Sequence, residues 1–236
     1  MNATVFRETV RRHMTSVPFL FALLLFCATA GSVATLGGPM VVLQIVSLVG
    51  ILLSCQLIGP EFSRGTLQLI LVKPLNRSAY LLSRVAGVVV VLWVAIWISF
   101  AVDVIARLIA GATIDWTSHA VEPVNVSLAT ILLAALFALF GSMTRSYLNV
   151  AIYFCLKIGL PLFNGILSLI QGGTMVRRYP AIVKTVSTID TNLFPDASGV
   201  GRFDRQWTLM VLSNAAVALF LACLVFRNRE VPYGAD

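Results

Sequence analysis

Few residues of this sequence have the types and spacing that catalysis or metal binding requires. The two histidines, His13 and His119, lie far apart and outside the long apolar runs. The cysteines lie singly inside apolar runs, which is typical of small buried residues rather than of a disulfide framework. No Gly-x-x-x-x-Gly-Lys-Ser/Thr loop, His-Glu-x-x-His or Cys-x-x-Cys motif occurs. We therefore expect no catalytic residue, no metal site and no cofactor bound by this chain itself.

Lys157 is the charged residue that stands out, because it lies inside an apolar run, 147–170. It is about ten residues into the run, or about 15 Å from its start if the run is helical. An ionisable group deep in a membrane is costly and is a candidate functional residue. Pro161 and Asn164 follow within two helical turns. Lys157 and Asn164 are candidate substrate-path residues, with Lys157 meeting an anionic group. The alternative is that Lys157 snorkels or bonds to carbonyl groups of a neighbouring span.

The composition indicates that the elements carrying these residues cross a membrane. Of the 236 residues, 58% are hydrophobic and 11% are charged, and the mean hydropathy is +0.92. A soluble domain has about 45–50% apolar and about 25% charged residues. Because a lipid-embedded backbone must satisfy its own hydrogen bonds, we predict an all-α integral membrane protein.

We predict a single transmembrane domain, 1–236, with six spans of near the length of about 17–25 residues that a membrane helix needs. The predicted spans are 17–36, 40–59, 85–110, 124–141, 147–170 and 209–226. The longer segment 171–206 is expected to lie outside and to contain short helices. A cleaved signal peptide within the first run is the alternative for the N-terminal part.

The distribution of basic residues sets the predicted orientation. With the N-terminus inside, ten Lys and Arg residues lie on inner segments and six on outer ones. The connection after the fourth run carries Arg145 and no acid, whereas the one before it carries Asp115 and Glu122. The positive-inside rule therefore predicts that both termini are cytoplasmic. Asp103 and Arg107, near the outer end of the third run, are predicted to pair on one helix face, with a substrate or proton role as the alternative.

Residues 4–14 are predicted to form a helix in the membrane interface. Phe6, Val10 and Met14 share one face, and Arg7 and Arg11 lie on a neighbouring face. An apolar stripe beside a basic face suits contact with anionic lipid headgroups. The alternative is an ordinary cytoplasmic segment.

The segment 61–84 is the most informative, and it is cytoplasmic in this orientation. Charged and polar residues at its start are followed by an apolar stretch, 67–72, and then by a break at Pro74. We interpret it as a short amphipathic helix that docks on a soluble partner, followed by a helix that Ser78 caps. A plain loop is the alternative, although a bare connection needs only a few residues.

This segment resembles the signature of type-2 ABC transporter permeases, the transmembrane subunits of the ABC-2 family. The ending Phe-Arg-Asn-Arg-Glu-Val at 226–231 is similar to a common family ending, and the predicted elbow helix, six spans and external segment fit the family layout. Asn76 is a departure, since Ser is common there. The matching residues are Glu61, Gly-Thr-Leu-Gln-Leu-Ile-Leu at 65–71, Lys73, Pro74, Asn76, Arg77 and Arg84.

The resemblance implies the permease subunit of an ATP-driven exporter of a hydrophobic or amphipathic substrate, such as a lipid, peptide or drug. Segment 61–84 would carry a coupling helix that contacts a separate ATP-binding subunit, and that subunit would bind ATP and magnesium. Two ATP-binding subunits and two permeases, identical or related, would work in the plasma (inner) membrane of a bacterium or archaeon, with no nucleic acid. The residues implied at the contact are Glu61, Arg64, Thr66, Leu67, Gln68, Pro74 and Arg77.

Three other functions each need a specific sequence feature. A membrane enzyme needs clustered His, Asp, Ser or metal ligands, which the apolar runs lack. A non-transporting anchor would recruit a soluble partner through 61–84 without turnover. A secondary transporter would need a coupling-ion site, for which Lys157 is the candidate.

Overall fold

The computed structural model describes residues 2–35, 49–51, 53–54, 57, 76–144, 148–169, 180–194 and 204–228. Every regular element within these residues is a helix, which confirms the predicted all-helical class for this part of the chain. The helices are α1 (Ala3–Met14), α2 (Val17–Thr35), α6 (Arg77–Ile109), α7 (Trp116–His119), α8 (Val121–Met143), α9 (Leu148–Leu169), α11 (Pro180–Leu193) and α12 (Arg205–Asn228).

Three of the described helices, α6, α8 and α12, are long and apolar enough to cross a membrane. They cover the predicted third, fourth and sixth spans. Helices α1 and α2 are bent by 60° relative to each other, and counted together they give a fourth candidate. Helix α9 covers the predicted fifth span and contains the apolar stretch Leu148–Phe163. The predicted second span is described only at 49–51, 53–54 and 57, so the total of six spans stays a prediction.

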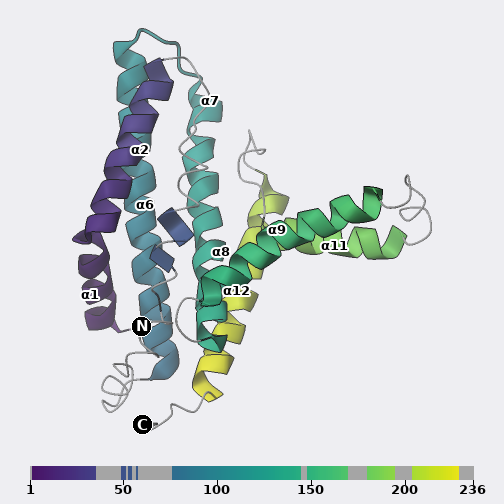
Figure 1. Ribbon diagram of the computed structural model, residues 1–236. Coiled ribbons are helices and arrows are strands. Elements are labelled where there is room, and N and C mark those ends of the chain that lie inside the picture. Colours follow the sequence, from purple (N-terminus) through teal and green to yellow (C-terminus); the bar gives the residue numbers. More distant parts are fainter. Residues whose placement is uncertain are drawn as a thin grey trace.

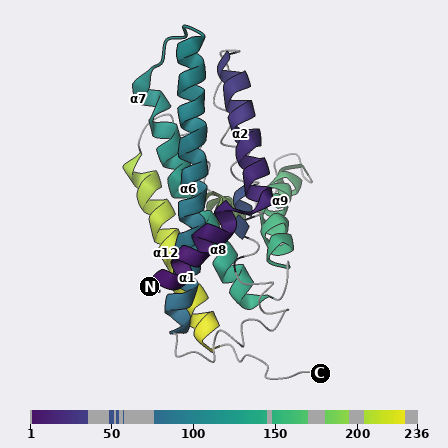
Figure 2. The ribbon, with the colours of Figure 1, turned by 90° about the vertical axis from the view of Figure 1, so that its left-hand side faces the viewer.

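The described helices form a bundle with an arm. Helices α6 and α8 run side by side, and α2 packs along α6 (Figure 1). Helix α12 packs against α8. Helices α9 and α11 pack on each other and lean away from the bundle as the arm (Figure 1). The view turned by 90° shows α1 crossing α6 obliquely near the end where α6 begins (Figure 2). The beginning of α6 and the end of α12 thus lie at the same end of the bundle as α1.

Helix α6 extends from one end of the bundle to the other, because its 33 residues give a length of about 50 Å. That exceeds the hydrocarbon core, which is about 30 Å thick. The helix begins at Arg77 because the side chain of Asn76 accepts a hydrogen bond from the N–H of Ser78 at 3.1 Å. The prediction that Ser78 caps the helix is therefore wrong by two residues. At the other end the chain leaves the helix through Gly111, whose φ of +68° favours glycine.

The main apolar core lies where α6 faces α2 and the side chains of Val49, Leu53 and Leu57. Its centre consists of fully buried aliphatic and aromatic side chains, which a membrane protein packs as tightly as a soluble one. A second cluster joins α8 to α12. The largest fully buried side chains of the main core are Phe26, Leu57, Leu81 and Leu92.

Candidate functional site

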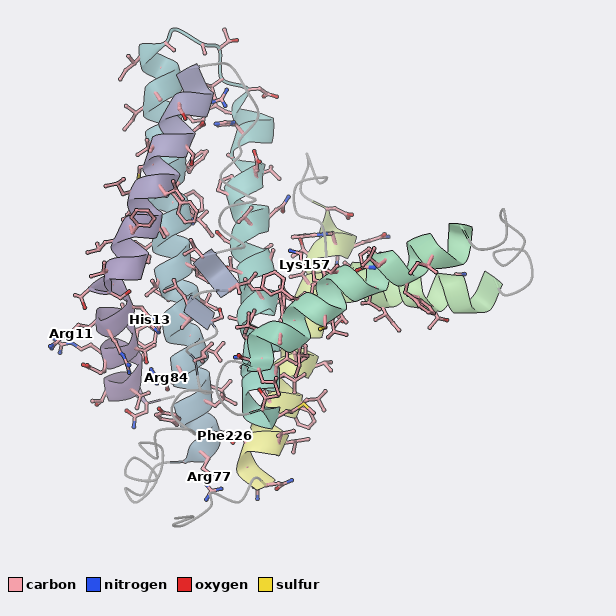
Figure 3. All side chains as sticks on the ribbon, viewed as in Figure 1. Arg11, His13, Arg77, Arg84, Lys157 and Phe226 are labelled. Carbon is pink, nitrogen blue, oxygen red and sulfur yellow. The ribbon has the colours of Figure 1, made fainter. Side chains whose placement is uncertain are left out.

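The predicted coupling segment leads into α6 at the start of that helix. Arg77 is the first residue of α6, and its Nη1 donates a hydrogen bond to the carbonyl oxygen of Arg227 at 3.4 Å. Arg227 lies in the last turn of α12, where a cation is favoured by the helix dipole. Arg77 therefore joins the beginning of α6 to the end of α12 (Figure 3). The other predicted coupling residues, Glu61, Arg64, Thr66, Leu67, Gln68 and Pro74, lie outside the described residues.

Helix α1 packs closely on α6 beside this end. A Cβ atom at position 87, where α6 carries glycine, would lie 2.8 Å from Cγ2 and 2.9 Å from Cβ of Thr9. Thr9 is 1% exposed, so this contact is part of the buried interface. The backbone N–H of Asn2 also donates to Oγ of Ser83 at 2.7 Å. Gly87 thus allows α1 to lie directly against the helix that carries Arg77.

His13 lies on the face of α1 that packs on α6, a face that was not predicted from the sequence. His13 is buried there, whereas Met14 of the predicted lipid-facing stripe is 37% exposed. The contact with α6 and the predicted stripe are therefore different faces of α1, and the interfacial position of this helix stays a prediction. Burial, together with the positive charges of Arg84 and Arg12, lowers the pKa of His13 to about 4, so its imidazole is neutral at pH 7. His13 and Arg84 point into the space between α1 and α6, while Arg11 points away from the bundle (Figure 3).

Lys157 lies in the middle of α9, and its side chain is exposed. Its Nζ is 5.7 Å from the centroid of the Tyr153 ring, which is a cation–π distance. Tyr153 is buried and packs against Phe137 and Phe194, with centroids 5.0 Å and 5.3 Å away. Asn164 lies on the same helix, two turns further along. The aromatic cluster therefore fixes the ring beside which the ammonium lies.

A cluster of polar side chains surrounds Asp103, near the end of α6. Oδ2 of Asp103 accepts from Nε of Arg107 at 3.0 Å, which confirms the predicted pair. His119 of α7, which the sequence did not predict at this place, has its Nε2 atom 2.6 Å from the same oxygen. Asp103 is 1% exposed, so two basic groups share a buried carboxylate. The available signal was that His119 lies in the short connection that follows the helix of Asp103.

The protein-family comparison gives a clear result. A family model described as ABC-2 family transporter protein matches residues 26–230, from α2 to just beyond α12. The chain belongs to the ABC-2 transporter family. The family predicted from the 61–84 segment is therefore confirmed, and this ABC-2 permease is the membrane component of a transporter. No curated protein matches the chain.

Membership of the ABC-2 family places the described geometry in context. The family implies association with an ABC ATP-binding subunit, and its permeases are the membrane components of transport. In this permease α1, the start of α6 and the end of α12 meet at one end of the bundle. The arm that carries Lys157 extends from the α8 side of the bundle, across from α1 (Figure 3).

Proposed function

We propose that this ABC-2 permease is the membrane-spanning subunit of an ATP-driven exporter of a hydrophobic or amphipathic molecule. The observation that carries the proposal is the family match over residues 26–230. The working unit contains two permeases, identical or related, and two ATP-binding subunits that bind ATP and magnesium. Each permease has six spans, an interfacial elbow helix and cytoplasmic termini in a bacterial or archaeal plasma membrane.

The ATP-binding subunit contacts the segment 61–84 in this proposal. Glu61, Arg64, Thr66, Leu67 and Gln68 make the contact, and the segment returns to the membrane through Pro74 and Arg77. The support from the structure is that Arg77 begins α6 and bonds to the end of α12. Helix α1 is packed on α6 nearby. Movement of the segment therefore acts on several helices rather than on one.

ATP-driven closure of the two ATP-binding subunits moves the coupling segments and tilts the spans between inward-open and outward-open states. The substrate path includes Lys157 and Asn164 on α9. Lys157 supports this part because it is exposed and is the one charged residue of α9. An exposed charge at this place has a use if it faces a path between two permeases rather than lipid.

The experiment that tests the proposal is purification of the tagged permease from its native membrane, with identification of the proteins that accompany it. The test variant carries Leu67→Glu and Gln68→Glu. The control carries the same two new charges as Ser187→Glu and Thr188→Glu, at exposed positions of α11. We expect an ATP-binding subunit to accompany the wild type and the control but not the test variant. An ATP-binding subunit that stays with the test variant, or is absent from the wild type, contradicts the proposal.

A further inference from the structure

Lys157 is placed where an ammonium group needs a specific partner. It lies in the middle of α9, within the apolar stretch Leu148–Phe163. Its side chain is exposed, and no carboxylate among the described residues forms an ion pair with it. An exposed charge on an apolar helix is costly wherever that helix contacts lipid tails. A negatively charged group from outside the described residues would therefore lower the cost of placing Lys157 there.

The ammonium group of Lys157 lies beside an aromatic ring that its neighbours hold in place. Its Nζ is 5.7 Å from the centroid of the Tyr153 ring. Tyr153 is buried, and the rings of Phe137 and Phe194 pack on it. Lys157 thus presents a positioned cation.

The surface next to this cation is apolar. Phe154, Ile158 and Leu162 recur at four-residue spacing, so they form a stripe along α9. Their side chains are 37%, 53% and 58% exposed. An inorganic anion gains nothing from such a stripe, whereas an alkyl or acyl chain is stabilised by it. A cation beside an apolar stripe therefore matches a molecule that has both an anionic head and an apolar tail.

We propose that the transported molecule is an amphiphile with an anionic, phosphate-like head group, and that Lys157 binds this head beside Tyr153. The apolar part of the molecule lies along Phe154, Ile158 and Leu162. This inference rests on the proposed transport function, because it names the class of substrate for the same permease.

The test compares amphiphiles that share one tail and differ in head-group charge. The permease, reconstituted in nanodiscs of phosphatidylcholine, is mixed with phosphorus-labelled dodecyl phosphate, and bound label is counted. Unlabelled dodecyl phosphate, dodecyltrimethylammonium and inorganic phosphate are the competitors. We expect only dodecyl phosphate to compete at low concentration. Equal competition by the cationic amphiphile, or by inorganic phosphate, overturns the proposal.

Substitutions at Lys157 test whether the site is the one described. Loss of a charge-assisted contact in Lys157→Met should weaken dodecyl phosphate binding about ten-fold or more. Lys157→Arg keeps the charge and should stay within about three-fold of the wild type. Lys184→Met, at an exposed lysine of α11, is the matched control and should bind normally. Unchanged binding by a folded Lys157→Met variant, judged by its elution volume and melting temperature, refutes the inference.

Two further measurements identify the source of the ligand and distinguish a failure of this inference from a failure of the proposed function. Nanodiscs that contain phosphatidylglycerol show whether a membrane lipid displaces the label, and displacement identifies the substrate as a lipid of the same anionic class. No displacement identifies a non-lipid amphiphile of that class. ATP hydrolysis by the complex with its ATP-binding subunit is measured separately. Lys157-dependent binding without stimulated hydrolysis contradicts the exporter function, whereas stimulated hydrolysis by head groups of any charge contradicts only the substrate class.

Discussion

The close approach of α1 to α6 makes Gly87→Ala the sharpest test of the packing. The new Cβ would lie 2.8 Å and 2.9 Å from two carbon atoms of Thr9, whereas ordinary contacts are 3.4–4 Å. Thr9 cannot easily turn away, because it is buried and its Oγ1 donates to the carbonyl of Val5 at 2.8 Å. Relief therefore requires α1 to move away from α6.

Two opposing effects set the expected change in the free energy of unfolding of Gly87→Ala. Overpacking of a well-filled interface costs about 1–3 kcal/mol. Replacing glycine by alanine inside a helix stabilises the fold by about 1 kcal/mol, because alanine has the higher helix propensity. Because two carbon atoms overlap with the new Cβ, the overpacking cost should lie in the upper part of its range. We therefore expect Gly87→Ala to lower the free energy of unfolding by about 1–2 kcal/mol.

Gly31→Ala in α2 is the matched control, because no described atom lies within 4 Å of a Cβ built there. This variant keeps the propensity gain and should be stabilised by about 0.5–1 kcal/mol. Unfolding in sodium dodecyl sulfate, followed by tryptophan fluorescence, gives both free energies. Adding Thr9→Gly to Gly87→Ala removes the two clashing carbons, and the double-mutant cycle should show coupling of about 1 kcal/mol or more. Equal stability of the two alanine variants, or absence of coupling, refutes the described contact.

Three further outcomes follow from the polar contacts. Since His13 has a pKa of about 4 in the fold against an ordinary 6.5, stability is complete above pH 6.5 and falls as the pH drops to 4, by about 3 kcal/mol in total. The same unfolding assay at successive pH values should show this loss in the wild type and a smaller one in His13→Leu. Asp103→Asn removes the buried carboxylate that Arg107 and His119 contact. It should lower the free energy of unfolding by about 3 kcal/mol, measured as a lowered melting temperature. Trp93→Phe removes the hydrogen bond from Nε1 to the carbonyl of Ser127 at 2.9 Å, and should cost about 1 kcal/mol in the unfolding assay.

The parts of this fold that could be predicted from the sequence are those that depend on a single continuous segment. Apolar length indicated α6, α8 and α12, and a four-residue spacing indicated the pair of Asp103 with Arg107. The family followed from the 61–84 segment, because its residue types and order form a specific pattern, and the match over 26–230 confirms it. These features depend on local chemistry and need no knowledge of neighbours.

The features that were wrong or missed depend on contacts between distant segments. His119 contacts Asp103 because α7 brings the chain back to the end of α6. The buried face of α1 follows from its packing on α6 at Gly87, and a helical pattern considered alone cannot include that partner. The cap of α6 was placed at Ser78 rather than Asn76, because both residue types favour helix starts and the sequence does not distinguish them.

Helix α6 joins two polar contacts of the bundle as one unbroken helix. It begins at Arg77, which bonds to the end of α12, and it ends at Ile109, about 48 Å further on. Near that far end it carries Asp103, whose carboxylate contacts His119 of α7. The end of α12 and the short helix α7 are therefore both tied to the same continuous element.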